Sequence, residues 1–185
     1  APDGSTIINY GEISVSNAGL AALVAPTVKN MGMINAQMGN IVLAAHTEFT
    51  IDSTVDLYGD GLISFDADAL VENGYVENTG QLYANGGQVV MSVAAADTVL
   101  ESLINVDGYI EATSVGEQNG KVVLKGYDNS HIQLAGDIYI NGDAAGGSAG
   151  TMHANATSIT MDHAANIFAD AVSHGDGGDV VLYGD

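Results

Sequence analysis

The chain has 185 residues and a formal net charge of −20, with three lysines, no arginine and no cysteine. Phosphate binding needs clustered lysine or arginine, so we expect no nucleic-acid partner, and repulsion excludes anionic membrane surfaces. The chain can form no disulfide or thiolate metal site, and no apolar run reaches the about 20 residues of a membrane-spanning helix, so we expect no membrane insertion.

A short strand-like motif that begins with glycine recurs along the chain. Its copies are GEISV at Gly11, GMINA at Gly32, GQLYA at Gly80, GYIEA at Gly108 and GDIYI at Gly136, with a degenerate copy, NIFA, at Asn166. From Gly80 to Gly136 the copies are 28 residues apart, whereas Gly32 and Gly80 are 48 apart. The longer gap predicts one additional turn of the repeat, containing YGDGLISFDAD.

A second, more apolar strand follows most copies of the first. It appears as GNIVLAA at Gly39, GQVVMSV at Gly87, GKVVLKG at Gly120, GTMHANA at Gly150 and GDVVLYG at Gly178. Alternate residues form one apolar set, which we expect to point inward: Ile41, Leu43 and Ala45; Val89, Met91 and Val93; Val122, Leu124 and Gly126; Val180, Leu182 and Gly184. The residues between them should point outward, because alternation with a period of two is typical of a strand.

Repeats of 20–30 residues built from strands indicate a solenoid, whose coils bury one another's apolar faces. We predict that residues 1–185 form one all-β segment, a right-handed parallel β-helix (β-solenoid) of about six to seven coils. The glycines suit the corners, and Asn30 and Asn78, which precede two of them, could stack as a hydrogen-bonded ladder. The alternative fold is a two-sheet sandwich of antiparallel strands; the in-phase apolar repeat favours the β-helix.

One outward column of the first strand is partly aromatic. In register, the column would contain Asn35, Tyr83, Glu111, Tyr139 and Phe168, with Tyr109 and Tyr183 nearby. Exposed aromatic rings bind sugars or partner proteins, so Tyr83, Tyr139 and Phe168 are the candidate partner-binding residues. The alternative is an aromatic ladder that only stabilises the sheet, and Glu111 would interrupt the column.

The acidic and histidine residues do not form a metal-site pattern. DLYGDGLISFD, with Asp56, Asp60 and Gly61, fails the spacing of a calcium-binding EF-hand loop, and HGDGGD at 174–179 is typical of a turn. The histidines are too far apart in sequence for paired metal ligation, and we expect them on the surface or in turns: His46, His131, His153, His163 and His174. We therefore expect no catalytic residues, no cofactor and no specific metal site, with only loose binding of Ca²⁺ to the acidic surface.

The chain resembles a family of secreted bacterial proteins. Residues 11–65 contain GLAALVAP, the pattern N-x-G-x-I-x-A-x-x-G-x-I-x-LAA and LYGDGLISF, and related repeats continue in 108–126 and 177–185. These features resemble the β-helix repeat region of filamentous-haemagglutinin-type adhesins, which are two-partner-secretion exoproteins of Gram-negative bacteria. The Asn-Pro-Asn signatures of that family's secretion domain are missing, so no role in transporter recognition is assigned to this segment.

The resemblance implies a β-helical fibre that is secreted to the extracellular space or the bacterial cell surface and acts in adhesion. On this basis we expect a structural, non-enzymatic protein. The segment would be part of a longer chain or a processed fragment; alternatively, its open coil ends would associate with those of other copies to form a filament. A second hypothesis is a module that binds host or matrix glycans or proteins through the aromatic flank. A third, a polysaccharide-active β-helix enzyme, is disfavoured because chemistry on acidic sugars needs arginine or lysine near the site, whereas this chain has no arginine and its net charge of −20 would repel such sugars.

Overall fold

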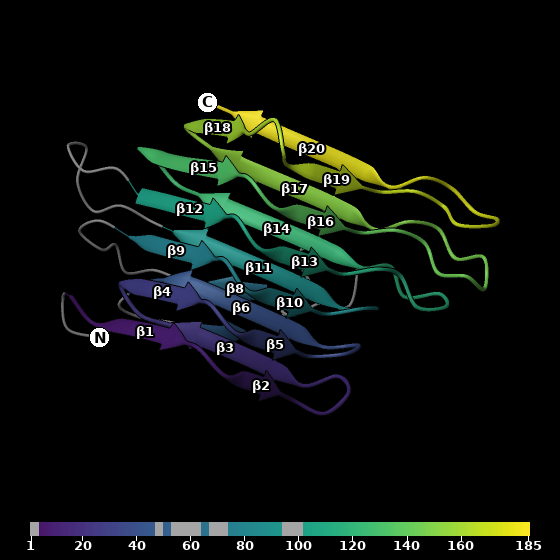
Figure 1. Cartoon of the computed structure of the whole chain (residues 1–185), viewed down its shortest axis with the longest axis horizontal. Coiled ribbons are helices and arrows are strands. Elements are labelled where there is room, and N and C mark those ends of the chain that lie inside the picture. Colours follow the sequence, from purple (N-terminus) through teal and green to yellow (C-terminus); the bar gives the residue numbers. More distant parts are fainter. Residues whose placement is uncertain (1–3, 47–49, 53–63, 67–73, 94–101) are drawn as a thin grey trace.

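The computed structural model describes residues 4–46, 50–52, 64–66, 74–93 and 102–185, and these form a parallel β-helix of about six coils. Each coil contributes one strand to each of three six-stranded parallel sheets, here named sheets A, B and C. The coils rise from the N-terminal coil at the bottom of Figure 1 to the C-terminal coil at the top. The described residues contain no helix, and so none that could span a membrane.

The strands follow one another around each coil in the order A, B, C. Sheet A consists of β1 (Thr6–Asn9), β4 (Thr27–Asn30), β9 (Tyr75–Asn78), β12 (Ser102–Val106), β15 (Ser130–Leu134) and β18 (Ser158–Met161). Sheet B consists of β2 (Glu12–Ser14), β5 (Met33–Asn35), β10 (Gln81–Tyr83), β13 (Tyr109–Glu111), β16 (Asp137–Tyr139) and β19 (Asn166–Phe168). Sheet C consists of β3 (Leu20–Val24), β6 (Asn40–Ala45), β11 (Gln88–Val93), β14 (Lys121–Gly126), β17 (Thr151–Ala156) and β20 (Asp179–Gly184).

The predicted repeat corresponds to sheets B and C, and the register confirms it. Met91 aligns with Leu43 on one side and with Leu124 on the other, as the apolar alternation required. Sheet A was not predicted, because the repeat indicated two strands per coil whereas the structure has three. Its strands are short and differ in sequence, from TVKN to SHIQL, so that their alignment becomes visible only through the pairing.

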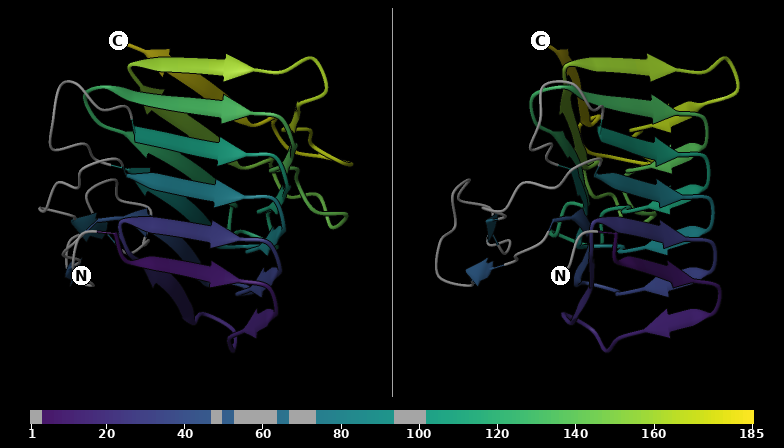
Figure 2. Two further views of the ribbon diagram at one scale, coloured as in Figure 1. Left: turned by 60° about the vertical axis from the view of Figure 1, so that its left-hand side comes forward. Right: turned by 90° about the vertical axis from the view of Figure 1, so that its left-hand side faces the viewer.

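The additional coil predicted between Gly32 and Gly80 is wrong. Leu82 of β10 pairs directly with Ile34 of β5, and Val76 of β9 pairs directly with Val28 of β4. The extra residues form an insertion between β6 and β9, which contains β7 (Thr50–Asp52) and β8 (Ser64–Asp66). These two strands pair antiparallel and lie beside the three-sheet stack (Figure 2).

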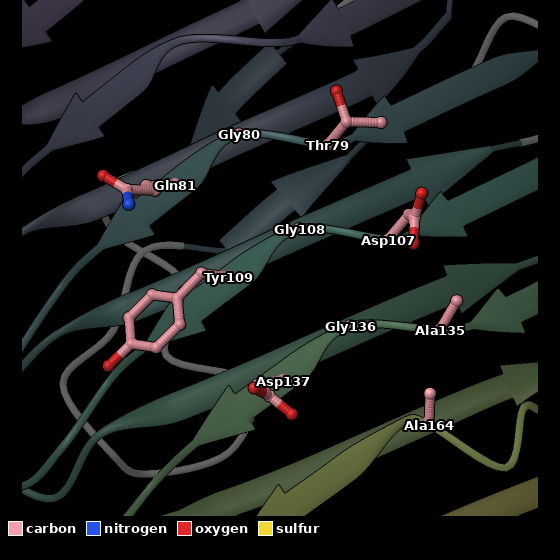
Figure 3. Close-up of a pocket in the computed structure, with 10 residues that line it drawn as sticks. All are labelled: Thr79, Gly80, Gln81, Asp107, Gly108, Tyr109, Ala135, Gly136, Asp137 and Ala164. Atoms are coloured by element: carbon pink, nitrogen blue, oxygen red, sulfur yellow. The ribbon is translucent and has the colours of Figure 1, made fainter.

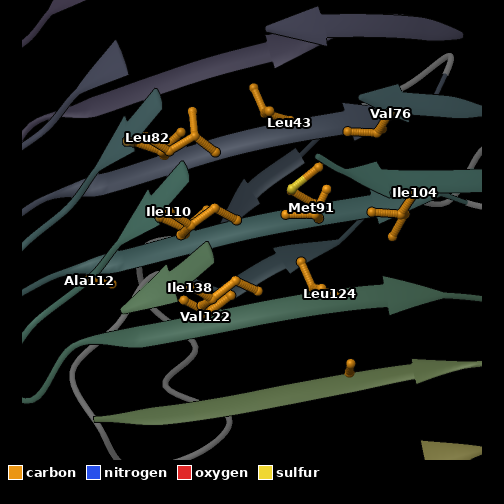
Figure 4. Close-up of a cluster of buried hydrophobic side chains, with 14 of the residues drawn as sticks. Leu43, Val76, Leu82, Met91, Ile104, Ile110, Ala112, Val122, Leu124 and Ile138 are labelled. Atoms are coloured by element: carbon orange, nitrogen blue, oxygen red, sulfur yellow. The ribbon is translucent and has the colours of Figure 1, made fainter. Parts of the chain in front are cut away.

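The core is a set of apolar columns that run along the axis of the solenoid (Figure 4). Ile104 from sheet A, Ile110 from sheet B and Met91 from sheet C are each 0 % exposed and belong to one cluster. Each coil buries its inner side chains against the coils above and below it, because one coil alone cannot enclose them. Stability therefore comes from the stacking.

The outward side of sheet C departs from expectation. Val42, Ala44 and Val90 point away from the core but are at most 8 % exposed, and they form a second apolar cluster. The equivalent position on β20, Val181, is 48 % exposed. Sheet C is therefore buried on both faces along β6 and β11, but on its inner face only along β14 and β17.

Glycines make the corner between sheets A and B. A Cβ atom on Gly80 would lie 2.0 Å from the carbonyl oxygen of Gly32 in the coil beneath, and one on Gly108 would lie 2.2 Å from that of Gly80. No side chain fits at that distance, so Gly80 and Gly108 require glycine. The predicted asparagine ladder is confirmed beside it: Asn9 Nδ2 donates to Asn30 Oδ1, and Asn30 Nδ2 donates to Asn78 Oδ1, both at 2.8 Å.

Candidate functional site

The predicted outward column exists on sheet B. Tyr83, Glu111, Tyr139 and Phe168 align in consecutive coils, and Asn35 precedes Tyr83 in the same column. Tyr139 and Phe168 are in direct contact, with ring centroids 4.6 Å apart and planes inclined by 16°. Tyr83 lies two coils below Tyr139 and does not contact it through the column itself.

Tyr109 completes the aromatic column. Its ring centroid lies 5.5 Å from that of Tyr83 and 5.1 Å from that of Tyr139, so it occupies the gap left by Glu111. The interruption expected at Glu111 is therefore wrong, because a residue two positions earlier on the same face supplies the ring. We call the four residues Tyr83, Tyr109, Tyr139 and Phe168 the aromatic ladder.

Glu111 anchors the ladder from its own position in β13. One carboxylate oxygen accepts a hydrogen bond from the Tyr109 hydroxyl and the other accepts one from Asn85 Nδ2, both at 2.6 Å. Burial, the hydrogen bond to Glu111 and the charge of that carboxylate raise the pKa of Tyr109 well above its ordinary value. The hydroxyl therefore remains a donor at every physiological pH.

Tyr183, expected near the column, lies elsewhere. It belongs to β20 on sheet C, where it aligns with Asn155, and it is 54 % exposed. The aromatic ladder is thus confined to one flank, whose rings are half-buried. Tyr139 and Phe168 stack, so the ring faces that they turn toward each other are covered. The surface that a binding partner could contact therefore consists largely of ring edges and hydroxyl groups.

An open furrow runs beside the ladder, along the corner between sheets A and B (Figure 3). It has a volume of about 360 Å³, and Gly80, Gly108 and Gly136 lie along it in successive coils. The polar residues that line it include Asp107, Tyr109 and Asp137. The furrow exists because the corner excludes side chains, and it offers oxygen acceptors to a ligand rich in hydroxyl or ammonium groups.

Sequence reasoning missed the furrow, although its signal was present. Residues directly before and after each repeat glycine line it, such as Asp107 and Tyr109 around Gly108. Tyr109 is the residue that the ladder and the furrow share, whereas the sequence predicts it only near the column.

A second polar cluster lies on the outward face of sheet A. Lys29 Nζ is 3.2 Å from Glu77 Oε2 and 4.9 Å from the ring centre of Tyr75, whose hydroxyl donates to Glu77 Oε1 at 2.8 Å. Burial, the hydrogen bond to Glu77 and its charge raise the pKa of Tyr75 to about 12. Burial raises the pKa of Glu77, but the hydrogen bond from Tyr75 and the Lys29 ammonium outweigh it, so the pKa lies below its ordinary value. This cluster ties two coils together.

The histidines are dispersed over the solenoid. His153, His163 and His174 are exposed, as expected, but His46 is fully buried, with Nε2 3.1 Å from Ser92 Oγ. The surface expectation is wrong for His46 because the outward side of sheet C is covered there. Among the described residues, no group of three or more histidine, aspartate or glutamate residues could hold a metal ion.

The two acidic motifs fall in different parts of the chain. Asp56, Asp60 and Gly61 lie outside the described residues. Residues 174–178 form bends and irregular chain, and Asp179 begins β20. The backbone N–H of Asp176 donates to Ser148 Oγ at 3.1 Å.

No family model and no curated protein matches this chain. The parallel β-helix therefore rests on the structure itself, and the filamentous-haemagglutinin resemblance rests on the motifs in the sequence.

Proposed function

We propose that this chain is a structural, non-enzymatic β-solenoid segment of an extracellular, adhesin-like protein of a Gram-negative bacterium. The observation that carries the proposal is the unbroken stack: six coils pair in parallel through three sheets, and the core columns continue through all of them. Such a stack is stiff, because bending it would break strand pairing on one side. A stiff body with a dense negative charge stays soluble and holds its flanks away from the surface that carries it.

The motif resemblance to secreted adhesins gives this rod its biological setting, and the absence of cysteine and the net charge of −20 agree with an exported, acidic fibre. Its role would be to present a surface, with Ca²⁺ binding only loosely to the exposed carboxylates.

The test is adhesion by the immobilised chain. Beads coated with the 185-residue chain should be retained under flow on host cells or matrix, and beads coated with a heat-unfolded sample should not be retained. Equal retention of both samples, or of neither, would contradict the adhesin proposal. Release of reducing ends from a panel of polysaccharides would contradict the non-enzymatic part.

A second candidate function, a glycan- or protein-binding module, is favoured by the aromatic ladder and the furrow beside it. Tyr83, Tyr139 and Phe168 are the proposed contacts, with Tyr109 between them. The ladder supplies apolar edges and hydroxyl donors, and Asp107 and Asp137 supply acceptors nearby. This pairing of aromatic and carboxylate groups suits a sugar chain better than a purely apolar partner.

The binding candidate is tested on glycan and matrix-protein arrays. A Tyr83→Ala, Tyr139→Ala double variant should lose at least tenfold in signal for whichever ligand the parent chain binds. Tyr183→Ala, which removes an exposed tyrosine from sheet C, is the matched control and should bind like the parent. Unchanged binding by the double variant, with its fold confirmed by circular dichroism, would reject the aromatic ladder as the binding surface.

A further inference from the structure

Asparagine directly precedes glycine at four places in the sequence: Asn73, Asn85, Asn119 and Asn141. Asn73 lies outside the described residues. The other three lie in the segments that lead from sheet B into sheet C, which form one corner of the solenoid (Figure 1). The structure thus holds the same dipeptide in three different settings.

In an asparagine–glycine pair the asparagine side chain can react with the backbone that follows it. The backbone nitrogen of the glycine attacks Cγ of the asparagine, and glycine favours this step because no Cβ atom shields the nitrogen. The side-chain amide must be free to turn toward that nitrogen, and the N–H must be free to give up its proton. Hydrogen bonds that hold either group therefore slow the reaction.

The pair at Asn85 is held at both groups. Asn85 Nδ2 donates to Glu111 Oε1 at 2.6 Å, and Asn85 Oδ1 accepts a hydrogen bond from the Thr113 N–H at 3.0 Å. The Gly86 N–H donates to the Thr113 carbonyl oxygen at 2.7 Å. The side chain cannot turn toward Gly86 unless the two coils first separate at this corner.

The pair at Asn141 is held in the same way one coil further from Thr113. Asn141 Oδ1 accepts a hydrogen bond from the Asp170 N–H at 2.8 Å. The Gly142 N–H donates to the Asp170 carbonyl oxygen, also at 2.8 Å. Both reacting groups are again engaged by the neighbouring coil.

The pair at Asn119 differs from the other two. Asn119 is exposed, and among the described residues it makes no hydrogen bond through its side chain or its backbone. It follows a tight turn that is closed by the bridge between Val115 and Gln118. The Gly120 N–H donates to Ser114 Oγ at 3.4 Å, the longest and therefore the weakest of the three glycine contacts.

We propose that Asn119 is a site of spontaneous deamidation. The Gly120 nitrogen loses its proton and forms a bond to Cγ of Asn119; the bond from Cγ to Nδ2 breaks, and Nδ2 leaves with that proton as ammonia. Water then opens the five-membered succinimide at either carbonyl carbon, which leaves aspartate or isoaspartate at position 119. Because no partner takes part, the reaction proceeds whether or not the chain acts as an adhesin.

The two products should affect the solenoid differently. Each adds one carboxylate near Glu117 to a chain whose formal net charge is already −20. Isoaspartate also routes the main chain through the former side-chain carbon, directly before Gly120. That glycine is tightly packed, because a Cβ atom there would collide with the Ala112 carbonyl oxygen. Isoaspartate should therefore disturb the start of β14, whereas aspartate should leave it in place.

The experiment incubates the full chain at mildly alkaline pH and follows each pair by peptide mass spectrometry, with isoaspartate counted by enzymatic methylation. In the folded chain, Asn119 should convert at least about tenfold faster than Asn85 and Asn141, because those two must first break two or more hydrogen bonds. In urea the three pairs should convert at similar rates, because the dipeptide is the same.

Two variants separate the chemistry from a general loss of structure. Asn119→Gln keeps an amide, but its longer side chain closes a ring more slowly, so rapid isoaspartate formation should be lost. Asn119→Asp adds the charge without lengthening the backbone, and it should melt like the fresh parent, whereas the aged parent should melt at a lower temperature.

Equal conversion of the three pairs in the folded chain would overturn the proposal. An Asn119 that converts in urea but stays intact in the folded chain would overturn it as well, as would undiminished isoaspartate formation in Asn119→Gln.

Discussion

The Tyr109 hydroxyl donates a hydrogen bond to Glu111 Oε2 at 2.6 Å, although both residues lie on the three-residue strand β13. Residues two apart on a strand point to the same face, so the pair is able to form without any change of the backbone. Glu111 is the residue aligned with Tyr83 and Tyr139 in the adjacent coils, and Tyr109 supplies the aromatic ring between them. One hydrogen bond thus keeps an acidic residue within a continuous row of aromatic rings.

Removal of this ring should weaken the stack between coils. Tyr109→Ala loses ring contacts to both Tyr83 and Tyr139, each worth about 0.5–1.5 kcal/mol beyond burial, so the free energy of unfolding should fall by about 1–3 kcal/mol. Tyr109→Phe keeps the ring and should cost less. Tyr183→Ala should stay within about 0.5 kcal/mol. Urea unfolding followed by circular dichroism measures all three, and equal losses for Tyr109→Ala and Tyr183→Ala would show that the ladder contributes nothing.

Glycine substitutions at the corner should separate into two classes. Gly80→Ala places a Cβ atom 2.0 Å from the Gly32 carbonyl oxygen, and the overpacking should cost at least about 1–3 kcal/mol. Gly11→Ala meets open space and should leave the stability of the monomer within about 0.5 kcal/mol. Thermal melts of both variants and the parent chain make the comparison. A stable Gly80→Ala variant would contradict the close approach of the two coils.

The asparagine ladder should be sensitive at its middle residue. Asn30→Ala leaves Asn9 without its acceptor and the fully buried Asn78 without its donor, so we expect a loss of about 1–3 kcal/mol. Asn9→Ala removes the lower bond of the ladder together with the part-buried and exposed bonds that Asn9 makes to the Met33 carbonyl and the Gly11 N–H, and it leaves one buried oxygen, Asn30 Oδ1, without its donor. Because the bond between the two fully buried asparagines remains, this variant should cost less than Asn30→Ala. A loss at Asn9 equal to that at Asn30 would indicate that burial at position 30 adds nothing. Chemical denaturation of both variants gives the comparison.

The cluster of Lys29, Tyr75 and Glu77 should make stability depend on pH in two windows. The pKa of Tyr75 is raised from 10.0 to about 12, so its contribution is complete below pH 10 and is lost as pH rises toward 12. The pKa of Glu77 is lowered from 4.5, so its contribution is present above pH 4.5 and is lost as pH falls through the lowered value. Glu77→Gln should flatten the acid window, and Tyr75→Phe the alkaline one.

Melting temperature measured against pH for the parent and both variants checks these windows. Unchanged acid dependence in Glu77→Gln would assign the acid loss to other carboxylates, of which this chain has many. Because Lys29 also interacts with Glu77, the Glu77→Gln variant should lose part of its salt sensitivity as well.

The fold class, the register of sheets B and C and most of the aromatic column follow from the repeat in the amino-acid sequence. A glycine stands directly before each apolar alternation, and a parallel stack brings equivalent positions together, so the recurring motif alone is sufficient to align Leu43, Met91 and Leu124. The same logic places Tyr83, Tyr139 and Phe168 in one column and Asn30 over Asn78.

Other features become visible only in the folded chain, because no repeated sequence motif marks them. Sheet A has too little sequence identity between its strands to be recognised, and a gap of 48 residues is compatible either with an additional coil or with an insertion; pairing of Leu82 with Ile34 selects the insertion. Burial of His46, the place of Tyr109 in the ladder and the furrow beside it arise from contacts across coils. Sequence periodicity predicts which residues occupy equivalent positions in successive coils. The side chains that fill the gaps between those residues, and the segments that cover them, depend on packing in the folded chain.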